Sequence, residues 1–162
     1  MDIIHVRIKY SKTHGAKLIC LCHKGIDLYD RHNWYINKHM KTFYLFRNIK
    51  VDGVVTTIMF HRELLNLQDG EIRDHKNGNG LDNRISNLRP ATHSQNMCNQ
   101  GICSNNTSGI KGVRFREDHQ RWAGEVRYEC KRYSREFQTE DDAEKWVREK
   151  REELHGEFTN HG

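Results

Sequence analysis

The chain has 162 residues, a length that allows one ordinary domain or two small ones. Its 27 Lys and Arg outnumber its 22 Asp and Glu, and the resulting net charge of +5 suits a polyanionic partner. No stretch approaches the ~20 apolar residues of a membrane span and the start lacks a signal peptide's apolar core, so we expect a soluble, intracellular, cytoplasmic protein without a membrane partner.

Residues 1 to about 60 alternate apolar and polar positions in short runs that are typical of half-buried β-strands. Asp52-Gly53 predicts a hairpin turn, because this pair accepts the positive φ that a type I′ turn needs. His61 to Leu67 then predicts a short helix with three leucines to bury. The strands predicted in this part of the chain are 3–8, 17–22, 42–46 and 54–60.

A second hairpin is expected after residue 70. Ile72 to His75 predict a short strand, Asn77 to Gly80 a flexible turn, and a return strand is expected near Arg89, before a helical segment from Ser94 to Asn99. The first strand ends on Asp74-His75. A carboxylate beside an imidazole supplies a hard oxygen ligand for a divalent cation and a base near neutral pH, the two parts that activate water against a phosphodiester.

The run from Asp74 to Asn96 resembles the motif of HNH nucleases, in the version of phage and intron homing endonucleases where Asn replaces the last His. The resemblance rests on Asp74-His75, Asn77-Gly78, Asp82-Asn83-Arg84, Asn87-Leu88-Arg89 and Asn96. It implies an HNH nuclease domain over residues 1–100, with a β-rich N-terminal part and a ββα-metal unit at about 70–100.

The resemblance also implies a role for each of four residues. Asp74 and Asn96 would bind one divalent cation, Mg²⁺ or else Mn²⁺. His75 would be the general base that takes a proton from the attacking water. Asn87 would hold its strand against the hairpin and help to orient His75, because an imidazole acts as a base only with the correct nitrogen available.

Other interpretations of single residues stay open. Surface turns often contain an Asp-His pair, so the order and spacing of the whole motif carry the prediction. Asn87 could be purely structural, His93 is a rival ligand or phosphate contact, the role of His61 is open, and Arg62 could contact a phosphate. The five cysteines have spacings unlike the paired Cys-x-x-Cys of some HNH nucleases, so we expect reduced thiols and no structural zinc.

From Gly101 to Gly109 the chain turns to Gly, Ser, Asn and Thr, which predicts a linker between two modules. Beyond this linker, residues 110–116, 121–128 and 131–137 predict three strands, and Thr139 opens a helix that runs to about His155. Thr139 can cap the first turn of that helix, and the three acidic residues after it favour the positive end of the helix dipole.

The tail resembles an AP2 DNA-binding domain, which in microbial and phage proteins often follows an HNH nuclease. The resemblance covers residues 110–160 and rests on the segments 108–113, 122–127, 137–143 and 154–158. The predicted fold class is therefore α+β: a small β-rich region, a ββα-metal unit, and a three-stranded sheet with one helix.

By this second resemblance, one face of the tail's sheet would lie on DNA. Strand alternation puts Arg114 and Arg116 on one side of the first strand. The predicted DNA-binding residues of the sheet are Arg114, Arg116, Glu125, Arg127, Lys131 and Tyr133. Asp118 stands where plant AP2 domains often carry a groove-facing Trp, so their base specificity does not transfer. The alternative is that these arginines form only the solvated face of the sheet.

The two resemblances together predict a site-directed HNH endonuclease that hydrolyses a phosphodiester in double-stranded DNA with a divalent metal, as a homing enzyme would. A monomer with one active site would nick one strand, and a dimer on DNA could cut both. The alternative is a non-catalytic, sequence-specific DNA-binding regulator derived from an HNH nuclease. An RNA-binding module is less favoured, because the tail lacks an exposed aromatic pair on a recognisable RNA platform.

Overall fold

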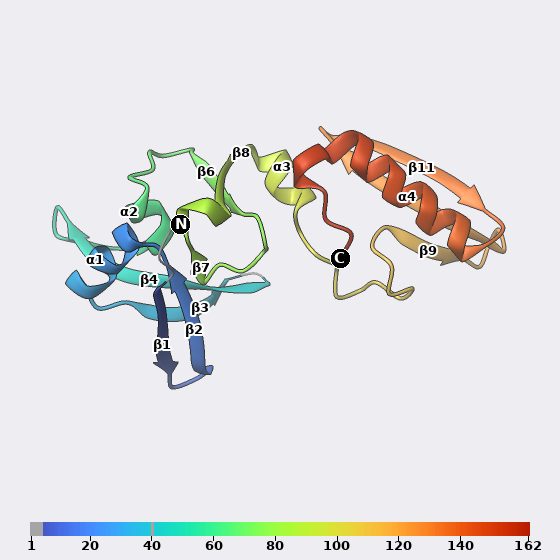
Figure 1. Cartoon of the computed structure of the whole chain (residues 1–162). Coiled ribbons are helices and arrows are strands. Elements are labelled where there is room, and N and C mark those ends of the chain that lie inside the picture. The colour runs from blue at the N-terminus through green and yellow to red at the C-terminus, as the bar shows by residue number, and fades with distance from the viewer. Residues whose placement is uncertain (1–4, 40) are drawn as a thin grey trace. The chain divides into compact units, whose positions relative to one another are not determined.

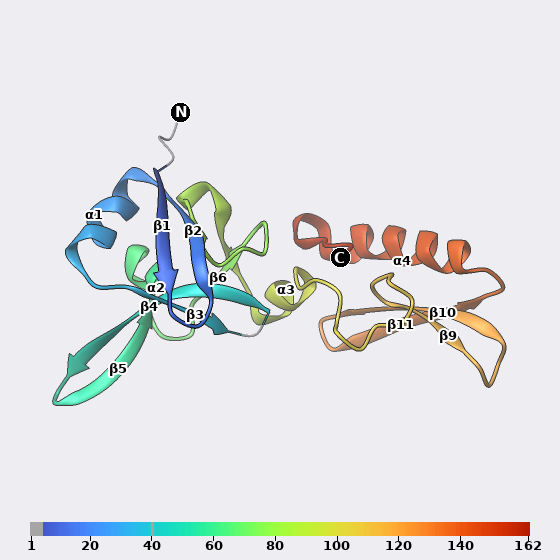
Figure 2. The same ribbon diagram turned by 90° about the horizontal axis from the view of Figure 1, so that it is seen from below.

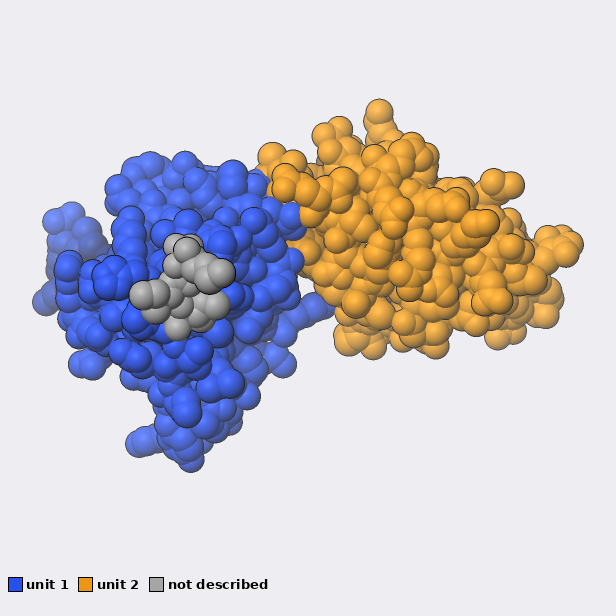
Figure 3. All heavy atoms as spheres, in the orientation of Figure 1, with its two compact units in different colours: residues 1–91 blue, residues 92–162 orange. Residues whose placement is uncertain are grey.

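The computed structural model describes residues 5–39 and 41–162 and has a mixed α+β fold (Figures 1 and 2). The chain divides into two compact units, residues 1–91 and 92–162 (Figure 3). Ile3 and Ile4, which begin the first predicted strand, lie outside the described residues. Within the described ranges, no helix combines the length and the apolar character that a membrane crossing requires. All five cysteines are described, and none forms a disulfide.

The first unit contains two three-stranded sheets, a two-stranded ribbon and short helices. One sheet has the order β1 (His5–Ser11), β2 (Gly15–Leu21), β7 (Asp82–Asn83), and the other β3 (Tyr35–His39), β4 (Thr42–Val51), β5 (Val54–Met59). The ribbon pairs β6 (Ile72–His75) with β8 (Leu88–Ala91). The helices are α1 (His23–Arg31), α2 (Phe60–Leu64) and the 3₁₀ turn η1 (Ile85–Asn87).

Helix α1 and strand β3 were not predicted from the sequence. Helix α1 begins after Cys22, whose side chain makes no capping hydrogen bond, so the usual start signal of a helix is absent. Its residues Ile26, Leu28 and Tyr29 pack against the core of the unit, which shows that tertiary burial stabilises this helix.

One apolar core holds the described part of the first unit together. Buried side chains from β2, β3, β4, α2 and β8 meet there with Trp34, which lies just before β3; they are Ile19, Leu21, Ile36, Leu45, Phe60, Leu64 and Leu88. Leu81, which lies in the turn between β6 and β7, is also buried in this core. The β6–β7 turn is therefore anchored by the N-terminal part of the unit.

Strand β7 ties this turn to the N-terminal sheet. It pairs in parallel with β2, with Cys20 opposite Asp82 and Leu21 opposite Asn83, and the Cys20 amide donates to the Leu81 carbonyl at 3.0 Å. A two-residue strand carries little sequence signal, because its pairing depends on a partner some sixty residues earlier in the chain. Through this pairing, the β-rich N-terminal part stabilises the turn between β6 and β7.

The second unit is a three-stranded antiparallel sheet covered on one face by a helix, as Figure 2 shows. The sheet has the order β11 (Lys131–Phe137), β10 (Arg121–Tyr128), β9 (Val113–Arg116), and the covering helix is α4 (Glu140–His155). Helix α3 (His93–Cys98) opens the unit and the 3₁₀ turn η2 (Gly156–Phe158) follows α4. Val113, Val126, Ala143 and Val147 form the core.

The two compact units divide between Ala91 and Thr92, ahead of the predicted linker at 101–109. The boundary lies before α3 because this helix forms hydrogen bonds within the second unit. The Ser94 hydroxyl accepts from the Glu129 amide at 3.3 Å, and the Asn160 side chain donates to the Asn99 carbonyl at 2.7 Å. The Gly- and Asn-rich segment has no regular structure and connects α3 to β9 inside the second unit.

Candidate active site

Strand β6 carries the predicted site residues Asp74 and His75 into the interior of the first unit. The antiparallel pairing of β6 with β8 sets Asp74 opposite Arg89 and His75 opposite Leu88. Asp74 and His75 each keep only 5% of their surface exposed. A carboxylate and an imidazole with this little exposure need specific partners, because burying a polar group without a partner is unfavourable.

Asp74 has a cationic partner across the ribbon. Its Oδ2 accepts from Arg89 Nε at 2.8 Å and lies 2.7 Å from Arg89 Nη2, and both side chains are nearly buried. The guanidinium compensates the carboxylate charge where water cannot. Asp74 is therefore held as an oxygen donor by its ion pair with Arg89.

The His75 ring is enclosed by two other rings and one amide. The ring centroids of Tyr44 and His61 lie 5.6 and 5.1 Å from that of His75, both nearly perpendicular to it, and Asn83 Oδ1 lies 3.4 Å from His75 Nε2. Burial lowers the pKa of His75, opposed by Asn83 and the charges of Asp74 and Asp82. Burial also lowers the pKa of His61 to about 3. Both rings are thus neutral near pH 7, the state in which an imidazole can accept a proton.

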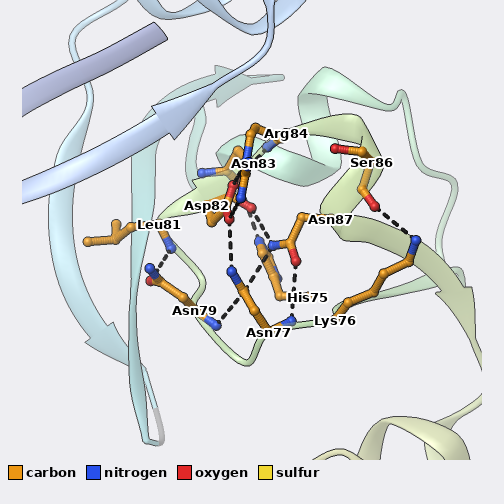
Figure 4. Close-up of polar contacts among 10 residues, drawn as sticks. All are labelled: His75, Lys76, Asn77, Asn79, Leu81, Asp82, Asn83, Arg84, Ser86 and Asn87. Carbon is orange, nitrogen blue, oxygen red and sulfur yellow. Dashed lines mark hydrogen bonds and ion pairs between the residues drawn. The ribbon is translucent and has the colours of Figure 1, made fainter. Parts of the chain in front are cut away.

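Figure 4 shows how Asn87 closes the turn that follows His75. Its amide nitrogen donates to Asn77 Oδ1 at 3.0 Å and to the Asp82 carbonyl at 2.8 Å, while its Oδ1 accepts from the Asn77 amide at 3.2 Å. The Lys76 amide donates to the Asn87 carbonyl at 2.9 Å. Asn87 therefore links η1 to the end of β6, and the side-chain amide bonded to the His75 ring belongs to Asn83.

Two cations surround the same turn. Arg84 Nε donates to Asp82 Oδ1 at 2.7 Å, and Lys76 Nζ donates to the Ser86 carbonyl at 2.8 Å. Burial would raise the pKa of Asp82, but Arg84 and Asn77 lower it. Asp82 is thus held as a carboxylate.

Asn96, the second predicted metal ligand, lies on α3 in the second unit. This helix starts with a capping box, in which Thr92 and Gln95 exchange hydrogen bonds between side chain and backbone. Asn96 is half-buried and the neighbouring His93 is exposed. Over residues 5–39 and 41–162, no three or more His, Cys, Asp or Glu side chains come together as a metal-binding group.

Comparison with known proteins identifies this region. Residues 66–98, which run from the end of α2 through β6, β7 and β8 to α3, match the HNH endonuclease family. The chain is also 37% identical over 87 residues to Protein 3.8 of Escherichia phage T7, an alignment that covers 52% of this chain and 70% of that protein. The chain belongs to the HNH endonuclease family. No solved structure gives a significant match.

Within this HNH-family protein, the residue beside the motif that was expected to contact a phosphate has an internal role. Arg62 Nη1 donates to the Glu71 carbonyl and Nη2 to the Gln68 carbonyl, each at 3.0 Å. The guanidinium thereby closes the loop between α2 and β6. Residues 66–71 belong to the matched HNH segment, so Arg62 stabilises the start of that segment.

The second unit carries a charged sheet face opposite α4. The strand register puts Arg114 opposite Ala123 and Glu125 opposite Ser134, and antiparallel partners share a face. Four of the six predicted DNA-binding residues of the sheet share this face, which also includes Arg132. The four are Arg114, Arg116, Glu125 and Arg127.

The register corrects the prediction for the third strand. Tyr133 pairs with the buried Val126 and Lys131 with Tyr128, so both lie on the face that α4 covers. The ammonium of Lys150 on α4 lies 5.3 Å from the centre of the Tyr133 ring. Their neighbours Arg132 and Ser134 lie on the face opposite α4 instead, because a shift of one residue along a strand moves a side chain to the other face.

The sheet face opposite α4 is called the open face, and its arginines differ in their acidic partners. Glu125 pairs with Arg127 and Arg132 at 2.8 Å each, and Arg116 pairs with Glu136 at 3.0 Å. Arg114 has no acidic partner among the residues that the structure describes. A shallow hollow on this face is lined by Arg114, Arg116, Arg132, Ser134 and Glu136, among others.

Sequence reasoning missed three contributors to the HNH site. Asn83 and Arg89 were part of the quoted motif but received no role, because only the fold brings one to the imidazole and the other to the carboxylate. Tyr44 lies on β4, thirty residues before the motif, and no local signal marks it. His61 was noted with its role open, and it packs against His75.

Proposed function

We propose that this HNH-family protein is a site-directed endonuclease that hydrolyses a phosphodiester in double-stranded DNA with the help of a divalent cation. The observation that carries the proposal is the buried Asp74–His75 pair at the end of β6, inside the segment that matches HNH endonucleases. A buried carboxylate next to a buried imidazole of lowered pKa has the composition of a hydrolytic site.

His75 is the proposed general base. Its buried ring is neutral near pH 7, so it can take a proton from the water that attacks the scissile phosphorus. The bond to the 3′ oxygen then breaks, and this oxygen takes a proton from solvent to become a 3′-hydroxyl. The products would carry 5′-phosphate and 3′-hydroxyl ends. Asn87 supports this role from a distance, because its hydrogen bonds hold the turn that follows His75.

The buried carboxylate of Asp74 is a donor of the kind that a hard divalent cation prefers. The resemblance to HNH homing enzymes implies Asn96 as a second oxygen ligand, and we propose this pair because carboxylate and amide oxygens are the donors that Mg²⁺ prefers and Mn²⁺ accepts. Such an ion supplies positive charge where negative charge develops on the phosphate. Arg89 already contacts Oδ2 of Asp74, so the carboxylate would be shared between the guanidinium and the ion.

The open sheet face of the second unit is the proposed DNA-binding surface, in an AP2-like role that gives affinity and register. Arg114 supports this role most directly, since no described acidic group neutralises it. Glu125 holds Arg127 and Arg132 in place through ion pairs. Arginines presented in this way can contact phosphates or guanine edges.

The biology that fits is homing, with the enzyme acting in the cytoplasm of a phage-infected cell. One chain carries one proposed active site, so we expect a monomer to nick one strand and a pair of chains on the duplex to cut both. The similarity to a phage protein and the net charge of +5 are compatible with this setting.

The deciding experiment incubates supercoiled phage or host DNA with the purified protein and Mg²⁺. Parallel samples contain EDTA or the His75→Ala variant, whose folding is checked by its melting temperature. Conversion to open circle by the wild type alone would establish the nuclease. The competing function is a non-catalytic DNA-binding regulator, which would retard DNA of its target sequence with or without Mg²⁺ and leave it uncut.

A further inference from the structure

We propose that Asn83 is a positioning residue that holds His75 in the tautomer with its proton on Nε2 and its lone pair on Nδ1. The inference rests on the proposed role of His75 as general base, because it names the nitrogen that accepts the proton from water. The tautomer itself is a property of the uncomplexed protein and can be measured without any DNA substrate.

The direction of the Asn83 side chain is set by a backbone group. Asn83 is completely buried on β7, and its Nδ2 lies 3.5 Å from the Gly80 carbonyl, which can only accept a hydrogen bond. The amide nitrogen therefore points to Gly80. The Oδ1 atom points to the imidazole, a contact drawn in Figure 4. The reverse orientation would set Oδ1 against the carbonyl oxygen, with two acceptors facing each other.

The oxygen of Asn83 decides the proton on the ring. An amide oxygen has no proton to give, so the Nε2 that lies 3.4 Å away must donate. A neutral imidazole carries one proton, and its lone pair is then on Nδ1. The packing around the ring also restrains it, because Tyr44 and His61 lie edge-on against the ring and limit its rotation.

The same packing reaches the carbonyl that orients Asn83. A Cβ placed on Gly80 would lie 2.5 Å from the Tyr44 ring and 2.6 Å from the Phe43 carbonyl oxygen, so Gly80, Tyr44 and the imidazole form one continuous packed layer. Asn83 is itself fixed because β7 pairs with β2. The N-terminal sheet thus holds the group that sets the tautomer of the proposed base.

The first test is spectroscopic and uses the full-length protein labelled with ¹⁵N-histidine. We expect His75, assigned by comparison with a His75→Gln sample, to show a protonated Nε2 and an unprotonated Nδ1. In Asn83→Leu the acceptor is removed and both tautomers should be populated, whereas Asn83→Asp keeps an oxygen and should keep the proton on Nε2. A proton on Nδ1 in the wild type, or an unchanged tautomer in Asn83→Leu, would overturn the proposal.

The second test is kinetic. Asn83→Leu should lower kcat by on the order of 10- to 100-fold, the usual effect of losing a group that orients a reactive histidine, with KM for DNA unchanged. Asn83→Asp should recover much of the loss. The matched control is Asn79→Ala in the same turn, since among the described residues Asn79 Oδ1 accepts from the Leu81 amide and makes no contact with His75.

These two tests separate the inference from the function on which it rests. A wild type that cuts no DNA would defeat the nuclease function, while the spectrum would still decide the tautomer. A wild type that cuts DNA while Asn83→Leu keeps full kcat would leave the nuclease intact and remove Asn83 from its mechanism.

Discussion

The pairing of Asp74 with Arg89 shows how single residues prepare the site. Both side chains are nearly buried, and Arg89 contacts one carboxylate oxygen through two nitrogens. Removing one partner of such a pair leaves a buried charge without compensation, which is far less favourable than losing both partners. The sequence marked Asp74 as a ligand, but it did not show that a guanidinium reaches the same carboxylate.

Replacing Arg89 by Met should destabilise the first unit by about 3–5 kcal/mol, because the buried Asp74 carboxylate loses its cationic partner. Chemical unfolding in urea would measure the change. The double variant Asp74→Asn with Arg89→Met is the control, and it should recover part of the loss. Equal stability of the single and double variants would show that the pair is not coupled.

The same variant reports on the metal. If Asp74 binds a divalent cation, Mg²⁺ should raise the melting temperature of Arg89→Met more than that of the wild type, because the ion replaces the missing positive charge. The double variant lacks the carboxylate and should show no such gain. A uniform response of all three proteins to Mg²⁺ would remove Asp74 from the list of ligands.

At the scale of elements, the turn between β6 and β7 is the most constrained piece of the first unit. Gly78 has a φ of 69°, a conformation that side chains other than glycine rarely adopt. Gly80 is constrained by space, since a Cβ at this position would lie 2.5 Å from the Tyr44 ring and 2.6 Å from the Phe43 carbonyl oxygen. The sequence predicted a flexible turn from its glycines, whereas the structure uses one of them for close packing.

Gly80→Ala should therefore lower the free energy of unfolding by about 1–3 kcal/mol, the range for overpacking an interior. Gly101→Ala is the matched control, because nothing lies within 4 Å of a Cβ at that position, and it should be neutral. Thermal unfolding of the two variants measures the difference. Similar melting temperatures for both would contradict the close approach of Gly80 and Tyr44.

The C-terminal end of α4 carries a buried histidine that links stability to pH. His155 Nε2 lies 3.1 Å from the Arg127 carbonyl, to which it donates, and in the described part of the chain its buried Nδ1 has no hydrogen-bond partner. Burial lowers the pKa of His155 in the folded state. The unfolded chain then binds the proton more readily, so this contribution to stability is complete above about pH 6.5 and is lost as the pH falls below it.

His155→Gln should flatten this dependence, because glutamine can still donate to the Arg127 carbonyl and does not titrate. Urea unfolding at pH 7.5 and 5.5, followed through the methyl NMR signals of Val126 and Val147, would measure the second unit alone. The wild type should lose more stability than the variant on acidification. An identical loss in both would show that His155 is not the titrating group.

At the scale of the whole molecule, the first unit carries the proposed general base, and the second unit carries the proposed DNA-binding face. DNA binding by the charged face of the second unit can be measured through its salt dependence, since each cation that neutralises a phosphate contributes to that dependence. Arg114→Gln should reduce the slope of log affinity against log salt by about one. Arg148→Gln on α4, away from the open face, is the control and should leave the slope unchanged.

The number of active sites predicts the form of the product. With one site per chain, open circles should accumulate before linear DNA when the enzyme is dilute. Sedimentation under the same conditions would establish whether the protein is a monomer. Efficient linearisation by a demonstrated monomer would contradict the prediction.

How much of the fold could be predicted from the sequence depended on how far apart in the chain the interacting residues lie. Local signals predicted β6, β10, β11 and α4 well, because alternation and capping are written into neighbouring residues. Helix α1 lacked a capping side chain and β7 needed a distant strand, so neither was predicted. Lys131 and Tyr133 lie on the face opposite to the predicted one, because the length of the turn before β11 is known only from the strand register.

The same distinction between local and long-range interactions applies to the candidate site. Asp74 and His75 could be predicted as candidates because they are adjacent in the motif, whereas Tyr44, Asn83 and Arg89 reach them only through the fold. A motif therefore predicts candidate reactive groups, and the fold supplies the groups that contact them.

The parallel pairing of β7 with β2 has a consequence for how such a protein can be rearranged. The family match begins at residue 66, yet the partner strand of β7 ends at residue 21 and the core that holds Leu81 is built mainly from earlier residues. A gene fragment that encoded only the matched segment would produce a chain with an unpaired β7 and an exposed Leu81. The smallest portion that could be moved to another protein as a working part must therefore begin before β2.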